Sequence, residues 1–138
     1  MIKVRGYMSS RDFMGERVPQ HVQNLVIRNY CNQNKYQYFL SAVEYVMDGS
    51  YLILKQILQE ITNLDGIGFY SIFQLPYNDK DRILFLEKIV KKKKFLFFCS
   101  EGFVVRNKKD INRINTIWLI KKNLNQSLKN FSYFKFNK

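Results

Sequence analysis

Four short apolar segments of this chain alternate with four segments in which apolar residues recur every three or four positions. Short apolar runs between turn residues are typical of strands, and the longer recurrence is typical of amphipathic helices. We expect strands at residues 2–8, 36–42, 66–73 and 95–99, and helices at 19–32, 51–61, 79–92 and 110–124. This order predicts an α/β domain, because parallel strands need crossovers that place helices on the faces of the sheet.

The chain of 138 residues has the length of one domain. We expect a single three-layer domain over residues 1–124, with a mainly parallel sheet of four or five strands in the flavodoxin-like order. Residues 125–138 mix aromatic and basic side chains, and we interpret them as a tail that packs back onto the domain.

No apolar run approaches the roughly 18 residues of a membrane span, and the first residues do not resemble an export signal. The two cysteines, Cys31 and Cys99, form neither a disulfide framework nor a CxxC pair, which suits a reducing compartment. These features predict a cytoplasmic protein, with contact at the inner face of a membrane left open.

The net charge of +12 lies entirely in residues 80–138, because residues 1–79 hold seven basic and seven acidic side chains. Such a basic half attracts phosphate-bearing partners, including nucleic acid, anionic lipid and nucleotide-linked substrates. Thirteen of its sixteen basic residues are lysines, which suit bidentate recognition of phosphates and bases less well than arginines do. Because the arginine motif described below is missing as well, we rank nucleic acid as an unlikely partner. We interpret Lys91–Lys94 as a solvated turn.

Polar residues follow each expected strand. In an open parallel sheet the ligand crevice lies beyond the carboxyl ends of the strands, so these residues are expected to share one edge. Ser9, Ser10, Glu44 and His21 are the candidates for catalysis, either serine as nucleophile and His21 as its base. The candidates for substrate binding are Arg11, Arg17, Gln20, Asn24, Ser71, Gln74 and Glu101.

The loop after the first expected strand is long and leads into a helix N-terminus, which favours an anion near Arg11 and Arg17. The alternative is that Arg17 pairs with Asp12 or Glu16. A lone histidine in a first helical turn, such as His21, is more often a surface residue. No dinucleotide or P-loop motif and no metal-ligand cluster is present in the sequence, so we expect no cofactor and no metal.

One resemblance rests on four stretches of sequence. They are RGYMSSRDFMGERVPQHVQNLVIRNYC at 5–31, SAVEYVM at 41–47, LDGIGFYSIFQLP at 64–76 and CSEG at 99–102. Together they resemble the sporadic carbohydrate cluster proteins, which are encoded among genes for surface polysaccharide or O-antigen (lipopolysaccharide) biosynthesis. The resemblance implies a role in making a cell-surface glycan, without naming a reaction.

The layout is also similar to the catalytic domain of serine resolvases and invertases. Gly6-Tyr7 precedes Ser9 and Ser10, as a Gly-Tyr strand precedes the active serine of that family. Gln20, Gln23 and Cys31 resemble its first helix, and Glu44 resembles its acidic position. The family's Arg-Leu-x-Arg motif is replaced by residues 74–77, which read QLPY. The resemblance implies a resolvase-like fold, and the missing arginines argue against strand exchange.

These observations rank three functions. The first is the binding or conversion of a phosphorylated or nucleotide-activated sugar in polysaccharide biosynthesis. The alternative is a non-catalytic scaffold or membrane-surface subunit of a glycan assembly enzyme. The third is a nucleic-acid binder derived from resolvases. Whether the chain is an enzyme stays open, and fold analogy suggests a homodimer.

Overall fold

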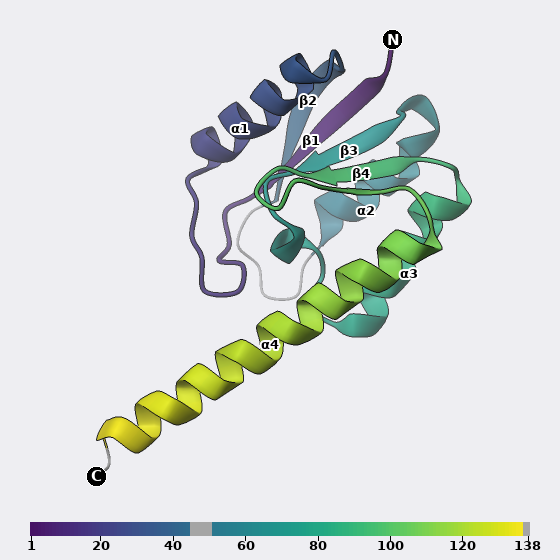
Figure 1. Cartoon of the computed structure of the whole chain (residues 1–138). Helices are drawn as coiled ribbons and strands as arrows, with labels where there is room; N and C mark the ends of the chain where they lie inside the picture. The colour runs from purple at the N-terminus through teal and green to yellow at the C-terminus, as the bar shows by residue number, and fades with distance from the viewer. Residues whose placement is uncertain (45–50, 137–138) are drawn as a thin grey trace.

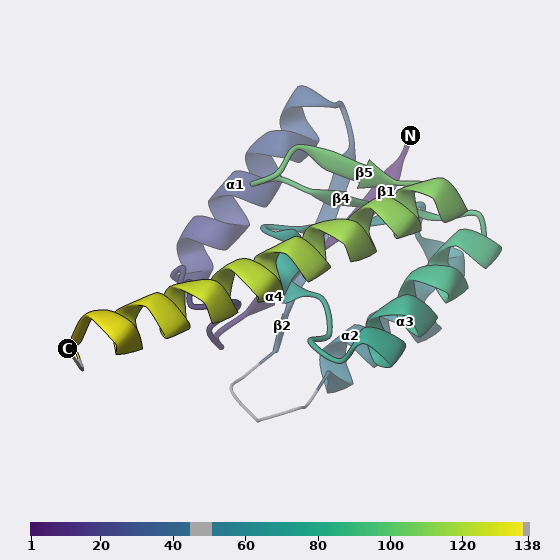
Figure 2. The same cartoon turned by 60° about the horizontal axis from the view of Figure 1, so that its bottom comes forward.

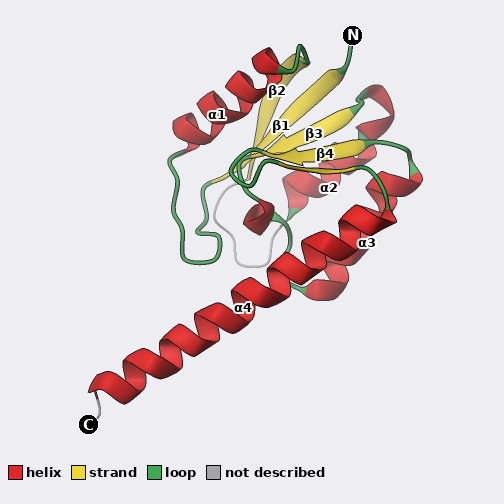
Figure 3. Cartoon of the chain, in the orientation of Figure 1, coloured by secondary structure: helices red, strands yellow, loops and turns green. Residues whose placement is uncertain are grey.

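A computed structural model describes residues 1–44 and 51–136 of the chain, with side chains for 1–44 and 51–130. Its sheet has the order β2-β1-β3-β4-β5. The strands are β1 (Lys3–Ser9), β2 (Gln37–Glu44), β3 (Gly66–Phe69), β4 (Phe95–Phe98) and β5 (Phe103–Val105). The first four pair in parallel, and β5 pairs antiparallel with β4. The prediction of a mainly parallel α/β sheet is confirmed (Figure 3).

The helices are α1 (Gln20–Gln33), α2 (Leu52–Gln59), α3 (Asp79–Lys91) and α4 (Lys108–Phe136), with short 3-10 turns η1 (Ile61–Asn63) and η2 (Ile72–Gln74). Helix α1 packs on one face of the sheet, while α2, α3 and α4 lie on the other side (Figure 1). The three layers expected from the sequence are therefore present. The solvated turn expected at Lys91–Lys94 is present over Lys92 and Lys93, while Lys91 is the last residue of α3 and Lys94 is partly buried.

The domain has two hydrophobic cores, one on each face of the sheet, because successive side chains of the buried strand β4 point to opposite faces. Phe95 and Phe97 belong to the core beneath α1, together with Ile27, while Leu96 and Phe98 belong to the larger core beneath the other helices. Neighbouring strand β3 reads Gly-Ile-Gly-Phe, and a Cβ atom at Gly66 would lie 2.8 Å from the Phe95 ring. The two glycines of β3 thus let aromatic rings from β4 lie directly over the strand.

Two features of the fold do not follow from the apolar pattern of the sequence. On the first helix the apolar residue Leu25 is 66% exposed, while Gln23, Ile27 and Cys31 are buried. The reason is that the Gln23 amide binds the backbone of two neighbouring segments and must face inward. The strand β5 was not predicted; it follows a turn at Gly102, whose φ of +63° suits glycine.

Helix α4 continues well past residue 124, where we expected the helix to end. Its first half packs through Ile111, Ile114 and Trp118. Its second half extends beyond the rest of the domain (Figure 1 and Figure 2). Residues 125–130 of the extension read NQSLKN, and their one apolar residue, Leu128, is 56% exposed, so this part of the helix has no buried apolar stripe from which the apolar pattern could predict it. The division of the chain at residue 124 stays a prediction.

Candidate functional site

The carboxyl ends of β1, β2 and β3 bring several of the predicted polar residues together. Ser9 is the last residue of β1, Glu44 is the last residue of β2, and Gln74 lies in η2 after β3. Ser9 and Gln74 are fully buried, and Glu44 is 2% exposed. The strand ends therefore converge as the topology predicts, but they converge inside the protein and not on an open rim.

An amide pair occupies the space around Ser9. The Gln74 side chain donates from Nε2 to Ser9 Oγ (3.1 Å) and to Gln23 Oε1 (2.8 Å). Gln23 in turn donates to the backbone carbonyls of Ser9 (2.9 Å) and Val18 (2.8 Å), and Gln74 Oε1 accepts from the Ser71 N–H (3.0 Å). These bonds link β1, the start of α1 and η2. They leave Ser9 buried, so its hydroxyl is not accessible to a bulky substrate.

Glu44 lies at the centre of a second buried group. Its carboxylate accepts hydrogen bonds from the Tyr7 hydroxyl and from the N–H of Ile53 (3.1 Å), at the start of α2. Arg11 Nη1 lies 3.7 Å from the same carboxylate, and Arg11 Nη2 donates to Tyr7 Oη (2.9 Å) and to the carbonyl of Gln74 (3.2 Å). The Arg11 guanidinium also lies 4.3 Å from the centre of the Tyr51 ring. Arg11 thus bridges the Glu44 group and η2.

Three of the predicted residues have structural partners elsewhere. Asn24 Oδ1 accepts from Tyr38 Oη (2.8 Å) and Ser41 Oγ (2.7 Å), which fastens α1 to β2. Ser71 Oγ donates to Glu101 (2.8 Å), whose other oxygen accepts from the Ile72 N–H (2.9 Å). Glu101 therefore fixes η2 from the turn between β4 and β5, and no contact within the described residues joins it to Glu44.

The remaining predicted residues lie at the surface near the start of α1. Ser10, Arg17 and Gln20 border a shallow pocket of about 420 Å³. Arg17 is 81% exposed and lies 3.8 Å from Asp12, which is one of the two pairings considered as the alternative to an anion site. His21 is exposed, and within the described residues no contact joins it to Ser9 or Ser10. The Ser10 hydroxyl donates weakly to the Glu44 carbonyl (3.4 Å).

Sequence reasoning left two members of the buried groups out of the candidate set. Tyr7 was noted only as part of the Gly-Tyr pair, and Gln23 only as part of a helix. A glutamine at the position of α1 that shares a face with Ile27 and Cys31 was the available signal, because a polar residue there needs buried partners.

Burial raises the pKa of five of the described side chains, Tyr30 and Tyr38 among them, and the shift is large for three. It raises the pKa of Tyr7 far above its usual value and outweighs the opposing effect of Arg11. Burial likewise raises the pKa of Cys31 to about 11 and that of Cys99 to about 12. All three groups are therefore neutral in the folded protein at pH 7.

These shifts predict alkaline destabilisation. A raised folded-state pKa contributes stability that is complete below the unfolded-state value and is lost as the pH rises toward the folded-state value. For the thiols this window runs from about pH 8.5 to about pH 12. We expect the thermal midpoint to fall by several degrees between about pH 8 and about pH 10.5, measured by circular dichroism. The double variant Cys31→Ala/Cys99→Ala should lose less, and an identical loss would contradict the assignment to the thiols.

Within the described residues, no group of three or more His, Cys, Asp or Glu side chains is arranged to hold a metal ion. None of the described helices combines the length and the apolarity that crossing a bilayer requires.

No protein-family model matches the chain, and no curated protein matches it in sequence. Solved structures do match. The N-terminal catalytic domain of TP901-1 integrase superposes with a TM-score of 0.68 at 16% identity, over 92% of this chain and 98% of that one. A resolvase family site-specific recombinase from Streptococcus pneumoniae gives a TM-score of 0.70 at 13% identity, over the whole of both chains. This chain has a resolvase-like fold.

The comparisons correct the function that we ranked first. The similar structures are the catalytic domain of an integrase and a site-specific recombinase, so the expected role in surface polysaccharide, O-antigen or lipopolysaccharide biosynthesis is wrong. The resemblance to carbohydrate cluster proteins has no support, and a sugar intermediate is not the indicated partner. Ranking nucleic acid as unlikely was wrong as well, because that ranking weighed the missing arginine motif above the shared layout.

Proposed function

We propose that this chain is a nucleic-acid-binding domain of resolvase-like fold that contacts phosphates through its basic C-terminal half and does not cleave the backbone. Two observations support the proposal together. The similar structures belong to a site-specific recombinase and an integrase. The whole net charge of +12 lies in residues 80–138, a range that includes most of α3 and all of α4.

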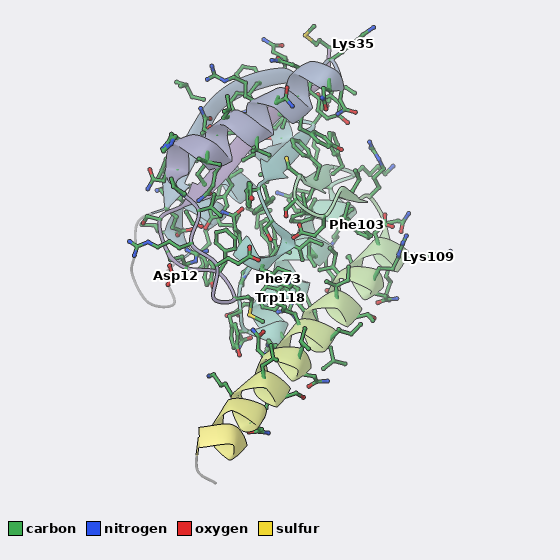
Figure 4. The ribbon with its side chains drawn as sticks, turned by 60° about the vertical axis from the view of Figure 1, so that its left-hand side comes forward. Asp12, Lys35, Phe73, Phe103, Lys109 and Trp118 are labelled. Atoms are coloured by element: carbon green, nitrogen blue, oxygen red, sulfur yellow. The ribbon has the colours of Figure 1, made fainter. Side chains whose placement is uncertain are left out.

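The exposure of this charge carries the proposal. Between residues 80 and 130, where side chains are described, ten basic side chains are exposed: Lys80, Lys88, Lys91, Lys92, Lys93, Arg106, Lys108, Lys109, Arg113 and Lys129. Lys109 marks the beginning of α4 in Figure 4. Lysines that neutralise phosphates release condensed counterions, which provides sequence-independent affinity for nucleic acid. The scarcity of arginine fits contact with phosphates more than recognition of particular bases.

The geometry at the strand ends argues against cleavage. Attack on a phosphodiester needs an accessible nucleophile and cationic donors around the phosphate oxygens. Ser9 is fully buried and bonded by Gln74, and the Arg11 guanidinium is engaged by Glu44, Tyr7 and the Gln74 carbonyl. Ser10 is only partly buried, but its hydroxyl donates to the Glu44 carbonyl, and within the described residues no contact joins it to His21 as a base. The buried hydrogen bonds around Ser9 instead connect and hold the strand ends.

Salt and charge reversal test the binding. We expect labelled duplex DNA to bind with an affinity that falls by about 10³ between roughly 50 and 200 mM salt if about six phosphates are contacted. Lys109→Glu/Arg113→Glu, on successive turns of α4, should weaken binding at least roughly tenfold at low salt and reduce the slope of log K against log salt by about 2. Fluorescence anisotropy measures both quantities.

The matched control changes the same net charge in the N-terminal half. Arg28 on α1 and Lys55 on α2 are both exposed, so Arg28→Glu/Lys55→Glu alters the total charge equally. It should change the affinity far less. Equal effects of the two double variants, or binding that does not respond to salt, would overturn the proposed surface. Incubation with supercoiled plasmid should leave it intact, and covalent attachment of protein to nicked DNA would refute the absence of cleavage.

A further inference from the structure

A groove of about 670 Å³ separates the loop after β1 from the second half of α4. Met14 and Gly15 border it from the loop, and Tyr77 borders it from the segment between η2 and α3. Ser9, Glu44 and Gln74 are not part of its lining. The groove is thus distinct from the buried groups at the strand ends, and its volume is in the range of pockets that hold small molecules.

Helix α4 presents a polar stripe to this groove. Lys122, Asn125, Gln126 and Lys129 all line it, and their spacing of three and four residues places them on one helical face. Seven residues separate the two lysines, which corresponds to about 10 Å along the helix axis. Among the described residues that line the groove there is no carboxylate. The stripe therefore offers two cations with two amides between them.

Tyr77 is an exposed aromatic ring held in a fixed position. The side chain is 59% exposed, yet its backbone N–H donates to Tyr51 Oη (3.2 Å) and its carbonyl accepts from Arg82 (3.2 Å) and Lys122 (3.0 Å). The ring lies edge-on to Trp118 at 6.0 Å, and Lys122 Nζ lies 4.1 Å from its centre. Figure 4 shows Trp118 of α4 beside Phe73, whose ring it contacts edge-on.

Lys122 is itself anchored, because its ammonium also contacts Asp79 Oδ1 at 3.0 Å. Asp79 additionally pairs with Arg82, so the positive end of this side chain is positioned before any ligand arrives. Lys129, seven residues further along α4, is exposed. A fixed aromatic ring beside cations and amides has the composition of surfaces that bind single-stranded nucleic acid by stacking and charge.

We propose that this groove binds a segment of single-stranded nucleic acid, with an unpaired base against Tyr77, phosphates at Lys122 and Lys129, and Asn125 and Gln126 hydrogen-bonded to the base edge or sugar. The inference rests on the proposed nucleic-acid binding and adds the strand type and the site. A base within a duplex has both faces covered by its neighbours, so only an unpaired base can stack on Tyr77.

A labelled short oligothymidylate and a duplex of the same length test this inference by anisotropy, with the sole tryptophan, Trp118, as a second reporter. Tyr77→Ala should weaken binding of the single strand roughly tenfold and leave the duplex within about twofold, whereas Tyr77→Phe keeps the ring and should match the original protein. Lys129→Gln should lower the single-strand salt slope by about 0.7. Lys55→Gln, on the exposed surface of α2, is the control.

The outcomes separate this inference from the proposed function. Salt-dependent duplex binding together with a Tyr77→Ala protein that binds the single strand normally would refute the groove and leave the proposed function standing. Failure of both nucleic acids to bind at low salt would refute both. Pyrophosphate and thymidine nucleotides are compared as competitors of the bound oligothymidylate. If pyrophosphate displaces it at the same concentration as the nucleotides do, the groove binds phosphate without base stacking, and the inference is overturned. Thermal unfolding of each variant checks that it is folded.

Discussion

Replacing Glu44 by alanine is expected to lower the free energy of unfolding by about 3 kcal/mol, because removing one member of a buried charged pair leaves its partners without their carboxylate. Glu44 is 2% exposed and connects three segments: Tyr7 on β1, the Ile53 N–H at the start of α2, and Arg11 in the loop after β1. Since domains of this size are stable by only about 5–15 kcal/mol, the loss is a large fraction of the total.

Urea unfolding followed by circular dichroism measures this loss. Two further variants show how much of it comes from the burial of the charged pair and how much from a single hydrogen bond. Glu60→Ala removes a carboxylate that also pairs with an arginine, Arg5, but is half exposed, so it should cost less than about 1 kcal/mol. Tyr7→Phe removes only the hydroxyl that donates to Glu44 and should cost about 1–2 kcal/mol. A Glu44→Ala protein as stable as the Glu60→Ala protein would show that the buried pair contributes nothing.

Replacing Trp118 by alanine is expected to cost about 3–5 kcal/mol, the usual range for deleting a large buried aromatic side chain. Trp118 is 1% exposed and its indole N–H donates to the Ile72 carbonyl (3.3 Å). Its ring also contacts Phe73 edge-on at 5.3 Å and lies under the Arg82 guanidinium at 4.3 Å. Loss of these contacts removes the main attachment of α4 to η2 and α3.

The neighbouring residue Leu119 supplies the control, because it lies on the same helix but is 60% exposed. Leu119→Ala should change the free energy of unfolding by no more than about 0.5 kcal/mol. Hydrogen exchange should show faster exchange of α4 in the Trp118→Ala protein, with β1 and β3 affected only through the lower global stability. Equal exchange across α4 and the sheet would contradict the view that Trp118 chiefly attaches the helix.

The order of strands and helices was predictable because each buried strand is a short apolar run, as Phe95–Phe98 illustrates. The strand β5 was not predictable in the same way, since Phe103–Val105 is only three residues long and pairs with the strand just before it. The inner face of α1 was not predictable from its apolar residues, because Gln23 is a polar residue whose burial depends on partners from other segments.

The candidate site was predictable only in part. Strand-end position correctly indicated that Ser9, Glu44 and Gln74 meet, because parallel strands end at one edge. It could not indicate that these side chains would form hydrogen bonds with neighbouring buried groups and be closed off from solvent. The groove beside Tyr77 was not predicted, because it depends on how α4 crosses the loop after β1, and no local pattern encodes that crossing.

The 29 residues of α4 form one uninterrupted helix, about 44 Å long at 1.5 Å per residue. The Trp118 attachment determines the direction in which this rod leaves the domain. Each residue also rotates the helix by about 100° about its axis. A single insertion beyond Lys122 would therefore turn the side chains of all following residues by about 100° around that axis. An insertion of seven residues would restore the orientation to within about 20°. The length of α4 beyond Lys122 therefore fixes which side of its far end faces a given direction. We expect homologous chains that use the same side of α4 to differ in helix length by seven residues or a multiple of seven.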